Sequence, residues 1–170
     1  MSRVSFSQQA SIPDVLDVIA YEMFFGSIPG GIGSSRGLNL RSKDTNIPGV
    51  SNEAFTQVIH GHTRNFRGRI VYSGTWSTTF VETVDGFTQA VARSWHNFCV
   101  DPETGNSRGY LKDYSVTARL KVYDTVGATV LTARLEEVFP QEVPDIQLSG
   151  EASAAMNVPI TWKYSRCIFE

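Results

Sequence analysis

The sequence predicts a mainly β protein, a β-sandwich or barrel of about seven or eight antiparallel strands with one flanking α-helix at about residues 86–99. Two observations support this class. Several segments alternate apolar and polar side chains with a period of two, the pattern of half-buried strands. One segment instead repeats its apolar residues at helical spacing. The chain has 170 residues, 41% hydrophobic and 11% aromatic, so a single domain, residues 1–170, is expected.

The N-terminal third is expected to be partly irregular. Residues 1–19 are interpreted as an N-terminal arm, and residues 20–27, AYEMFFGS, as a first strand. The Gly/Ser/Pro-rich segment GSIPGGIGSSRG begins an extended loop region, residues 26–52, within which a strand is expected around residues 38–45. The Pro-Gly pair in NIPGVSNEA indicates a tight turn near the end of this region.

The later strands are predicted from their alternation. We expect a short strand at FTQVIHGH, one long strand over residues 68–83, and another over residues 113–124. A turn at TVG leads into a strand that the Phe-Pro pair at residues 139–140 interrupts, and NVPITWKYSR forms the last strand. The residues expected to share inward faces are Ile70, Tyr72, Trp76, Thr78 and Phe80; Val116, Ala118, Leu120 and Val122; Leu131, Ala133 and Leu135; and Val158, Ile160, Trp162 and Tyr164.

The segment DGFTQAVARSWHNF, residues 85–98, predicts the helix. Its apolar stripe consists of Phe87, Ala90, Val91, Ser94, Trp95 and Phe98. Asp85 is placed to accept the unpaired amide protons of the first turn. The opposite face presents Gln89, Arg93, His96 and Asn97.

Composition excludes several classes of protein. The net charge of −2 argues against a protein that wraps nucleic acid electrostatically. The apolar run VIAYEMFF contains Glu22 and is far shorter than the about 20 residues of a membrane-spanning helix. The N-terminus shows no secretory signal, and Cys99 and Cys167 form no disulfide framework. A reducing cytoplasm is the expected compartment.

No candidate active site emerges from the motifs. His60 and His62 lie two apart, so in a strand both imidazoles would point to one face and could bind a metal. The residues that follow, Thr63 to Arg67, contain no carboxylate and two arginines, which disfavours a cation. The glycine-rich segment is not a phosphate loop, and DPETGNS lacks the ligand spacing of a calcium loop. We therefore expect no enzyme activity, no metal and no cofactor.

The order of the parts carries a resemblance. A strand with a tryptophan, a turn and an amphipathic helix, YSGTWSTTFVETVDGFTQAVARSWHNF, precedes DYSVTARLKVYDTVGATVLTARLEEVFPQEVPDIQLS and a closing PITWKYSR. Over about residues 20–166 this resembles the tail tube proteins of contractile-tailed bacteriophages, which are similar in fold to type VI secretion tube proteins. The proline-containing loop IPGVSNEA and the FP..V..IQLS stretch add to the resemblance.

The resemblance implies a structural virion protein. Its six-membered rings would stack into a hollow inner tail tube inside a contractile sheath, and the tube would conduct genomic DNA. Expected partners are other copies of the chain, the tail sheath, the baseplate and tail terminator proteins, and the tape measure protein and DNA in the lumen, with no membrane. The location would be the phage tail, assembled in the host cytoplasm.

Candidate contact residues follow from charge and from the resemblance. The candidates for contact between rings lie in the extended loop region: Arg36, Arg41, Lys43, Asp44, Pro48 and Gly49. The acidic candidates for the lumen or a ring face lie in a stretch without basic residues: Glu136, Glu137, Glu142, Asp145 and Glu151. An acidic or neutral lumen would let DNA slide, because basic contacts to phosphate add affinity. The sheath-facing candidates on the helix are Gln89, Arg93 and Asn97.

Two alternatives remain open at this point. One is a ligand-binding β-barrel module, which an exposed aromatic cleft would support, although most aromatics here fall at core-facing positions. The other is a metal-dependent β-barrel enzyme that uses His60 and His62.

Overall fold

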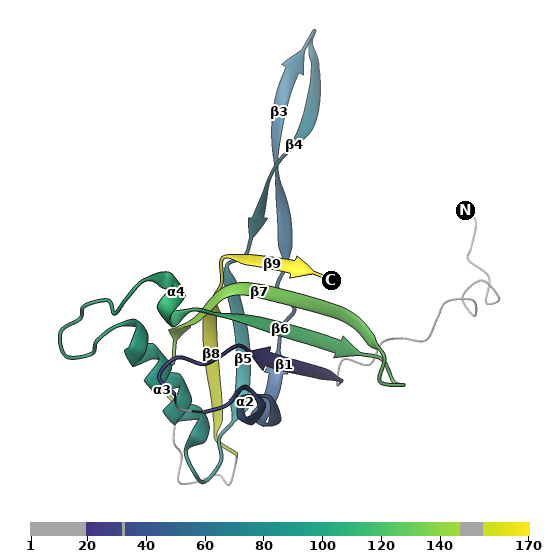
Figure 1. Cartoon of the computed structure of the whole chain (residues 1–170). Helices are drawn as coiled ribbons and strands as arrows, with labels where there is room; N and C mark the ends of the chain where they lie inside the picture. The colour runs from purple at the N-terminus through teal and green to yellow at the C-terminus, as the bar shows by residue number, and fades with distance from the viewer. Residues whose placement is uncertain (1–19, 32, 147–154) are drawn as a thin grey trace.

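The computed structural model of the chain describes residues 20–31, 33–146 and 155–170. In these residues the chain forms nine strands, one long helix and two short helices (Figure 1). The elements in order are β1 (Tyr21–Phe25), α2 (Ser35–Arg41), β2 (Ser42–Thr45), β3 (Val50–Ile59), β4 (His62–Tyr72), β5 (Thr75–Val81), α3 (Phe87–Cys99), α4 (Leu111–Tyr114), β6 (Val116–Tyr123), β7 (Thr129–Glu142), β8 (Asn157–Lys163) and β9 (Arg166–Phe169). The predicted class is confirmed.

All strand pairs are antiparallel. The main sheet has the order β1-β6-β7-β8-β5-β2, and β9 pairs with the free side of β7, while β3 and β4 form a separate ribbon. In Figure 1 the group β1, β6, β7 and β9 runs across the group β8, β5 and β2. Strand β7 joins the two groups, since its first part pairs with β6 and β9 and its last residues pair with β8.

A bulge at Glu137 allows β7 to serve both groups. Before it, Ala133 and Leu135 point into the core, and after it Val138 and Pro140 do. Glu137 has φ 58°, and the pairing with β6 shifts register beside it, as expected of a bulge. The predicted interruption at Phe139-Pro140 is wrong: Pro140 lies within β7 opposite Trp162. It is tolerated because it follows the last residue of β7 that pairs with β6, so one side of the strand there has no ladder.

The core is built around four aromatic rings. Phe25 lies 5.6 Å from Trp76 and 4.9 Å from Trp162, and Trp95 lies 5.2 Å from Trp162 between ring centres. The indole N–H of Trp162 donates to the buried Thr78 hydroxyl at 2.7 Å, and that of Trp95 to a backbone carbonyl at 2.7 Å. The three indoles therefore bury their rings without leaving a donor unpaired. The inward faces predicted for β5, β6 and β8 are all confirmed.

Helix α3 buries a stripe slightly different from the predicted one: Thr88, Val91, Ala92, Trp95 and Cys99. Ala90, predicted to face inward, is exposed. The main acceptor at the helix N-terminus is Glu82, whose carboxylate accepts from the backbone N–H of Thr88 at 3.0 Å and of Gln89 at 2.8 Å. From the helix backbone, Asp85 accepts only the N–H of Phe87, at 3.3 Å.

The segment of residues 26–52 is more ordered than predicted. Residues 35–41 form α2, capped by Ser34 Oγ, which accepts from Gly37 N–H at 3.0 Å. The strand expected around residues 38–45 is confined to β2. No helix in the described residues combines the length and apolar composition needed to cross a lipid bilayer.

Candidate assembly surfaces

A long ribbon projects from the molecule. Strands β3 and β4 are joined by His60-Gly61, with φ of 48° and 79°, a two-residue turn with positive φ at both positions. We call residues 50–72 the hairpin. It stands clear of the other elements in Figure 1, and every residue from 50 to 70 is exposed. The predicted long strand over residues 68–83 is wrong, because Ser73-Gly74 separates β4 from β5.

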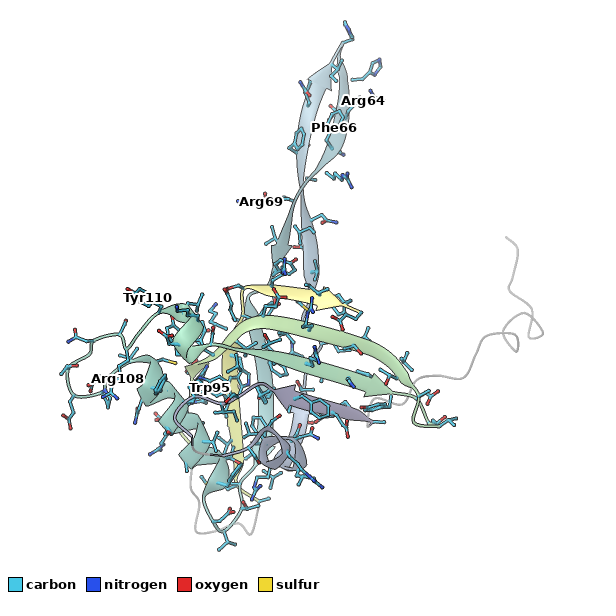
Figure 2. All side chains as sticks on the ribbon, in the orientation of Figure 1. Arg64, Phe66, Arg69, Trp95, Arg108 and Tyr110 are labelled. Atoms are coloured by element: carbon cyan, nitrogen blue, oxygen red, sulfur yellow. The ribbon has the colours of Figure 1, made fainter. Side chains whose placement is uncertain are left out.

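The hairpin carries apolar side chains that its own chain does not cover. The Phe55 and Phe66 rings stack at 5.4 Å between centres, yet they remain 55% and 37% exposed. The other exposed large apolar residues here are Val50, Val58, Ile59 and Ile70. Figure 2 shows Phe66 beside Arg64 in the outer half, far from the core. A concentration of exposed apolar residues on an isolated ribbon marks an interaction surface.

The hairpin is also basic. Its three arginines and one glutamate give it a net charge of +2. The whole chain has a net charge of −2, so the residues outside the hairpin together carry −4. Glu53 pairs with Arg69 through two bonds, at 2.8 and 3.0 Å. Arg64 and Arg67 have no carboxylate partner among the described residues.

A glycine lets the two strands of the hairpin approach closely near its middle. The register shifts between Asn52 and Ala54, and Gly68 lies there on the opposite strand. A Cβ at Gly68 would lie 3.0 Å from the carbonyl oxygen of Glu53 and 3.2 Å from its Cβ. In Figure 1 the strands cross at this part of the ribbon, close to the labelled Arg69 of Figure 2. The bulge therefore sets the twist of the outer half relative to the base.

The two histidines do not form the strand pair that the sequence suggested. His60 lies in the turn and His62 is the first residue of β4, so they do not lie two apart on one strand face. In the described part of the chain, no group of three or more His, Cys, Asp or Glu side chains is placed to hold a metal ion.

Arg41, a candidate for contact between rings, makes its contacts within the chain. Its guanidinium donates to Thr83 Oγ1 at 2.8 Å and to Asp85 at 3.0 Å, and it lies 4.3 Å from the centre of the Phe87 ring. The side chain is only 20% exposed. A hydrogen bond from Thr83, with help from Arg41, lowers the pKa of Asp85. Arg41 thus ties α2 to the start of α3.

The other candidates of this region lie on α2, on β2 and in the segment before β3. Arg36 is exposed on α2, and Asp44 is exposed on β2. Lys43 is exposed and donates to Asn157 at 3.5 Å. Pro48 is buried and Gly49 is exposed immediately before β3.

The comparisons with known proteins agree with this architecture. The model of the family described as phage tail tube protein matches residues 4–170. The chain belongs to this family. No curated protein is similar enough in sequence to be matched to it.

Two solved structures share the fold of this tail tube protein at low sequence identity, and a third chain, Hcp1, is a weaker match. One is a chain of the sheath–tube complex of PVC, an extracellular contractile injection system in its extended state, with TM-score 0.64, 13% identity and 99% of each chain covered. Another is a chain of the tube-terminating cap of the anti-feeding prophage, with TM-score 0.67, 7% identity and coverage of 94% and 93%. Hcp1 from Flavobacterium johnsoniae has TM-score 0.43, 8% identity and coverage of 89% and 94%.

The four acidic candidates that the structure describes have different surroundings. Glu136 is ion-paired with Arg166 at 2.7 Å and lies 3.6 Å from Arg134, so its charge is largely compensated. Glu137 is exposed at the bulge, and Glu142 is exposed at the end of β7. Asp145 lies beyond β7, where it lines a cavity against α3. Glu151 lies outside the described residues.

The helix candidates line a groove. Arg93 and Asn97 are exposed on α3 and face a cavity of about 220 Å³ that His96 and Val143 also line. A neighbouring cavity of about 360 Å³ lies between α3, at Gln89 and Arg93, and the segment after β7. Within the described ranges this polar face of α3 is left uncovered, and Arg93 lines both cavities.

Sequence reasoning missed one polar surface, the outer face of β1, β6, β7 and β9. On it Arg119 of β6 lies opposite Arg134 of β7, and Lys121 lies one step along β6. The Tyr123 hydroxyl donates to Glu22 at 2.7 Å, and this bond raises the pKa of Tyr123. The alternation along β6 indicates that Arg119 and Lys121 share its outer face. The sequence did not show which strands lie beside β6 and β7, above all β9, and these strands complete the surface.

Proposed function

We propose that this chain is a subunit of a hollow inner tail tube, built from stacked six-membered rings, that conducts DNA inside a contractile sheath. One observation carries the proposal. The hairpin exposes every residue from 50 to 70, and no other element of the described chain packs on its outer half (Figure 2). A protein of a tube-forming family that displays such a ribbon has a surface that another copy can bury.

Physical reasons favour another copy as the partner. An isolated two-stranded ribbon is marginally stable in water, so the hairpin gains stability from docking. Its charge of +2 complements the −4 of the rest of the chain, and such complementarity favours association with the correct partner. A contact between a projecting hairpin and a different surface of the next copy is heterologous, and heterologous contacts generate rings and tubes.

The further partners follow from the family and from the particles that contain similar folds. Two of the similar chains come from a sheath–tube complex and from a tube-terminating cap. For this chain we propose a sheath, a baseplate, a terminator and, in the lumen, a tape measure protein and DNA, within a phage tail assembled in the host cytoplasm.

The proposed contact sites divide among the surfaces described above. The groove around Arg93, with Gln89 and Asn97, is the proposed sheath contact. Arg36, Lys43 and Asp44, which are exposed on α2 and β2, are the proposed charged contacts between rings. The acidic residues remain candidates for a ring face or the lumen.

Negative-stain electron microscopy of the purified chain over a range of concentrations tests the proposal. Hollow tubes or rings with six-fold end views are the expected result. A variant in which Asn-Gly replaces residues 52–70 keeps the Ser51–Val71 pair at the base, and it should fold but form no tubes. Monodisperse small particles from the intact chain at every concentration would count against the proposal. So would tubes from the shortened variant.

A further inference from the structure

The two outer edges of the strand group β1-β6-β7-β9 differ in their free backbone groups. On β1, the N–H groups of Met23 and Phe25 point away from β6. They donate to Asn39 Oδ1 and to Ser35 Oγ of α2, both at 2.7 Å. Helix α2 therefore covers the β1 edge, one of the established ways of protecting an edge strand.

Among the residues that the structure describes, none covers the β9 edge in this way. Glu170 N–H donates to Thr132 at 2.8 Å across the β7 pairing. Hydrogen-bonded and non-hydrogen-bonded pairs alternate along an antiparallel ladder, so the backbone groups of Cys167 and Phe169 point outward. They have no hydrogen-bond partner within the described residues. The Phe169 side chain beside them is 44% exposed, so this edge offers both backbone groups and an apolar ring.

The hairpin has the matching edge on β3. In a two-residue turn the flanking pair, here Ile59 and His62, is hydrogen-bonded, so alternation directs the backbone groups of Thr56 and Val58 away from β4. Residues 54–59 of β3 contain no charged side chain, whereas β4 carries three arginines. Charged side chains on an edge resist pairing, so β3 is the more receptive edge.

We propose that, in the tube, the β9 edge of one copy pairs with the β3 edge of the hairpin of a second copy. The inference rests on the proposed self-assembly and names the two strands that meet. The hairpin extends away from its own β9 (Figure 1), so the donor is another molecule. Pairing would extend the sheet by one strand and bring the Phe55 and Phe66 pair next to the exposed Phe169 ring. The basic hairpin would meet a chain whose remainder carries −4.

Proline substitutions test this pairing, since proline removes a backbone donor and is tolerated on edge strands. Phe169→Pro removes the outward donor of β9, and Val58→Pro removes one of β3. Neither N–H is used within the subunit, so the thermal unfolding of the monomer should be unchanged. Phe169→Leu retains the N–H and serves as the control. The proline ring occupies the place of the outward N–H and keeps the partner strand from approaching, so either proline should abolish the whole pairing. Each single variant should therefore raise the critical concentration for tube assembly about tenfold or more.

The double variant decides whether the two edges meet each other. If they do, Val58→Pro adds nothing once Phe169→Pro is present, and the double variant assembles at the same critical concentration as the single ones. A rise equal to the product of the two single effects would show independent partners and overturn the proposal. So would a Phe169→Pro chain that assembles like the wild type, and either result leaves the tube function standing. An intact chain that never assembles would overturn both.

Discussion

Replacing the two stacked aromatic residues of the hairpin should weaken tube assembly without weakening the subunit. In the double variant Phe55→Thr/Phe66→Thr, threonine retains a good strand propensity. Full burial of a phenylalanine side chain contributes about 1.5–3 kcal/mol. With 55% and 37% of the two side chains still exposed in the monomer, complete cover by a neighbour adds about 1.5–2.5 kcal/mol per contact. The association constant should therefore fall about 10- to 100-fold.

The assay is sedimentation of tubes at increasing protein concentration, in which the plateau of the supernatant gives the critical concentration. The control is Val126→Thr, which removes an apolar residue that is 89% exposed in the β6–β7 turn. Thermal unfolding followed by circular dichroism should be the same for all three chains, since Phe55 and Phe66 lie outside the core. An unchanged critical concentration for the double variant would refute the reasoning, because it would show that the hairpin aromatics stay exposed in the tube.

Three further predictions follow from the charges and the buried groups. Glu82→Ala removes the acceptor of two backbone donors at the start of α3. Urea denaturation should show that the free energy of unfolding falls by about 1–2 kcal/mol. An unchanged free energy would show that water replaces the carboxylate. Because the hairpin is basic and the rest of the chain is acidic, salt should weaken assembly. The critical concentration, measured by light scattering, should rise about threefold or more between 50 and 500 mM salt. Arg64→Glu should raise the critical concentration at low salt. Burial raises the pKa of the Cys99 thiol to about 11, so mass spectrometry should find no alkylation of Cys99 by iodoacetamide at pH 8 in the folded chain and full alkylation in urea.

The sequence predicted the strands that bury one face. In β6 and β8, alternate residues enter the core, so the period of two is imposed by burial and is visible without a structure. Trp76 and Trp162 in particular bury their rings where the alternation placed them. The helix was predicted for the same reason, with its stripe displaced because Thr88 and Ala92 also face the core.

The hairpin could not be predicted in the same way. Neither of its faces is buried, so no alternation marks its strands. The run from Ile70 to Phe80 looked continuous although Gly74, with φ 68°, separates two strands with different neighbours. The available signal was the dipeptide His60-Gly61, a two-residue turn with glycine second. The bulge at Glu137 was hidden for a related reason, because a non-glycine residue at positive φ leaves no mark in the pattern.

The charge of the hairpin explains how two open strand edges can be displayed without uncontrolled association. Exposed edges are liable to pair with one another, and two hairpins meeting edge to edge would bring together two charges of +2. Like charges disfavour that encounter, while the −4 of the remaining chain favours the approach of a hairpin to the body of another copy. The three arginines of β4 thus act against hairpin–hairpin pairing and for the heterologous contact, and only the heterologous contact propagates into a ring or a tube.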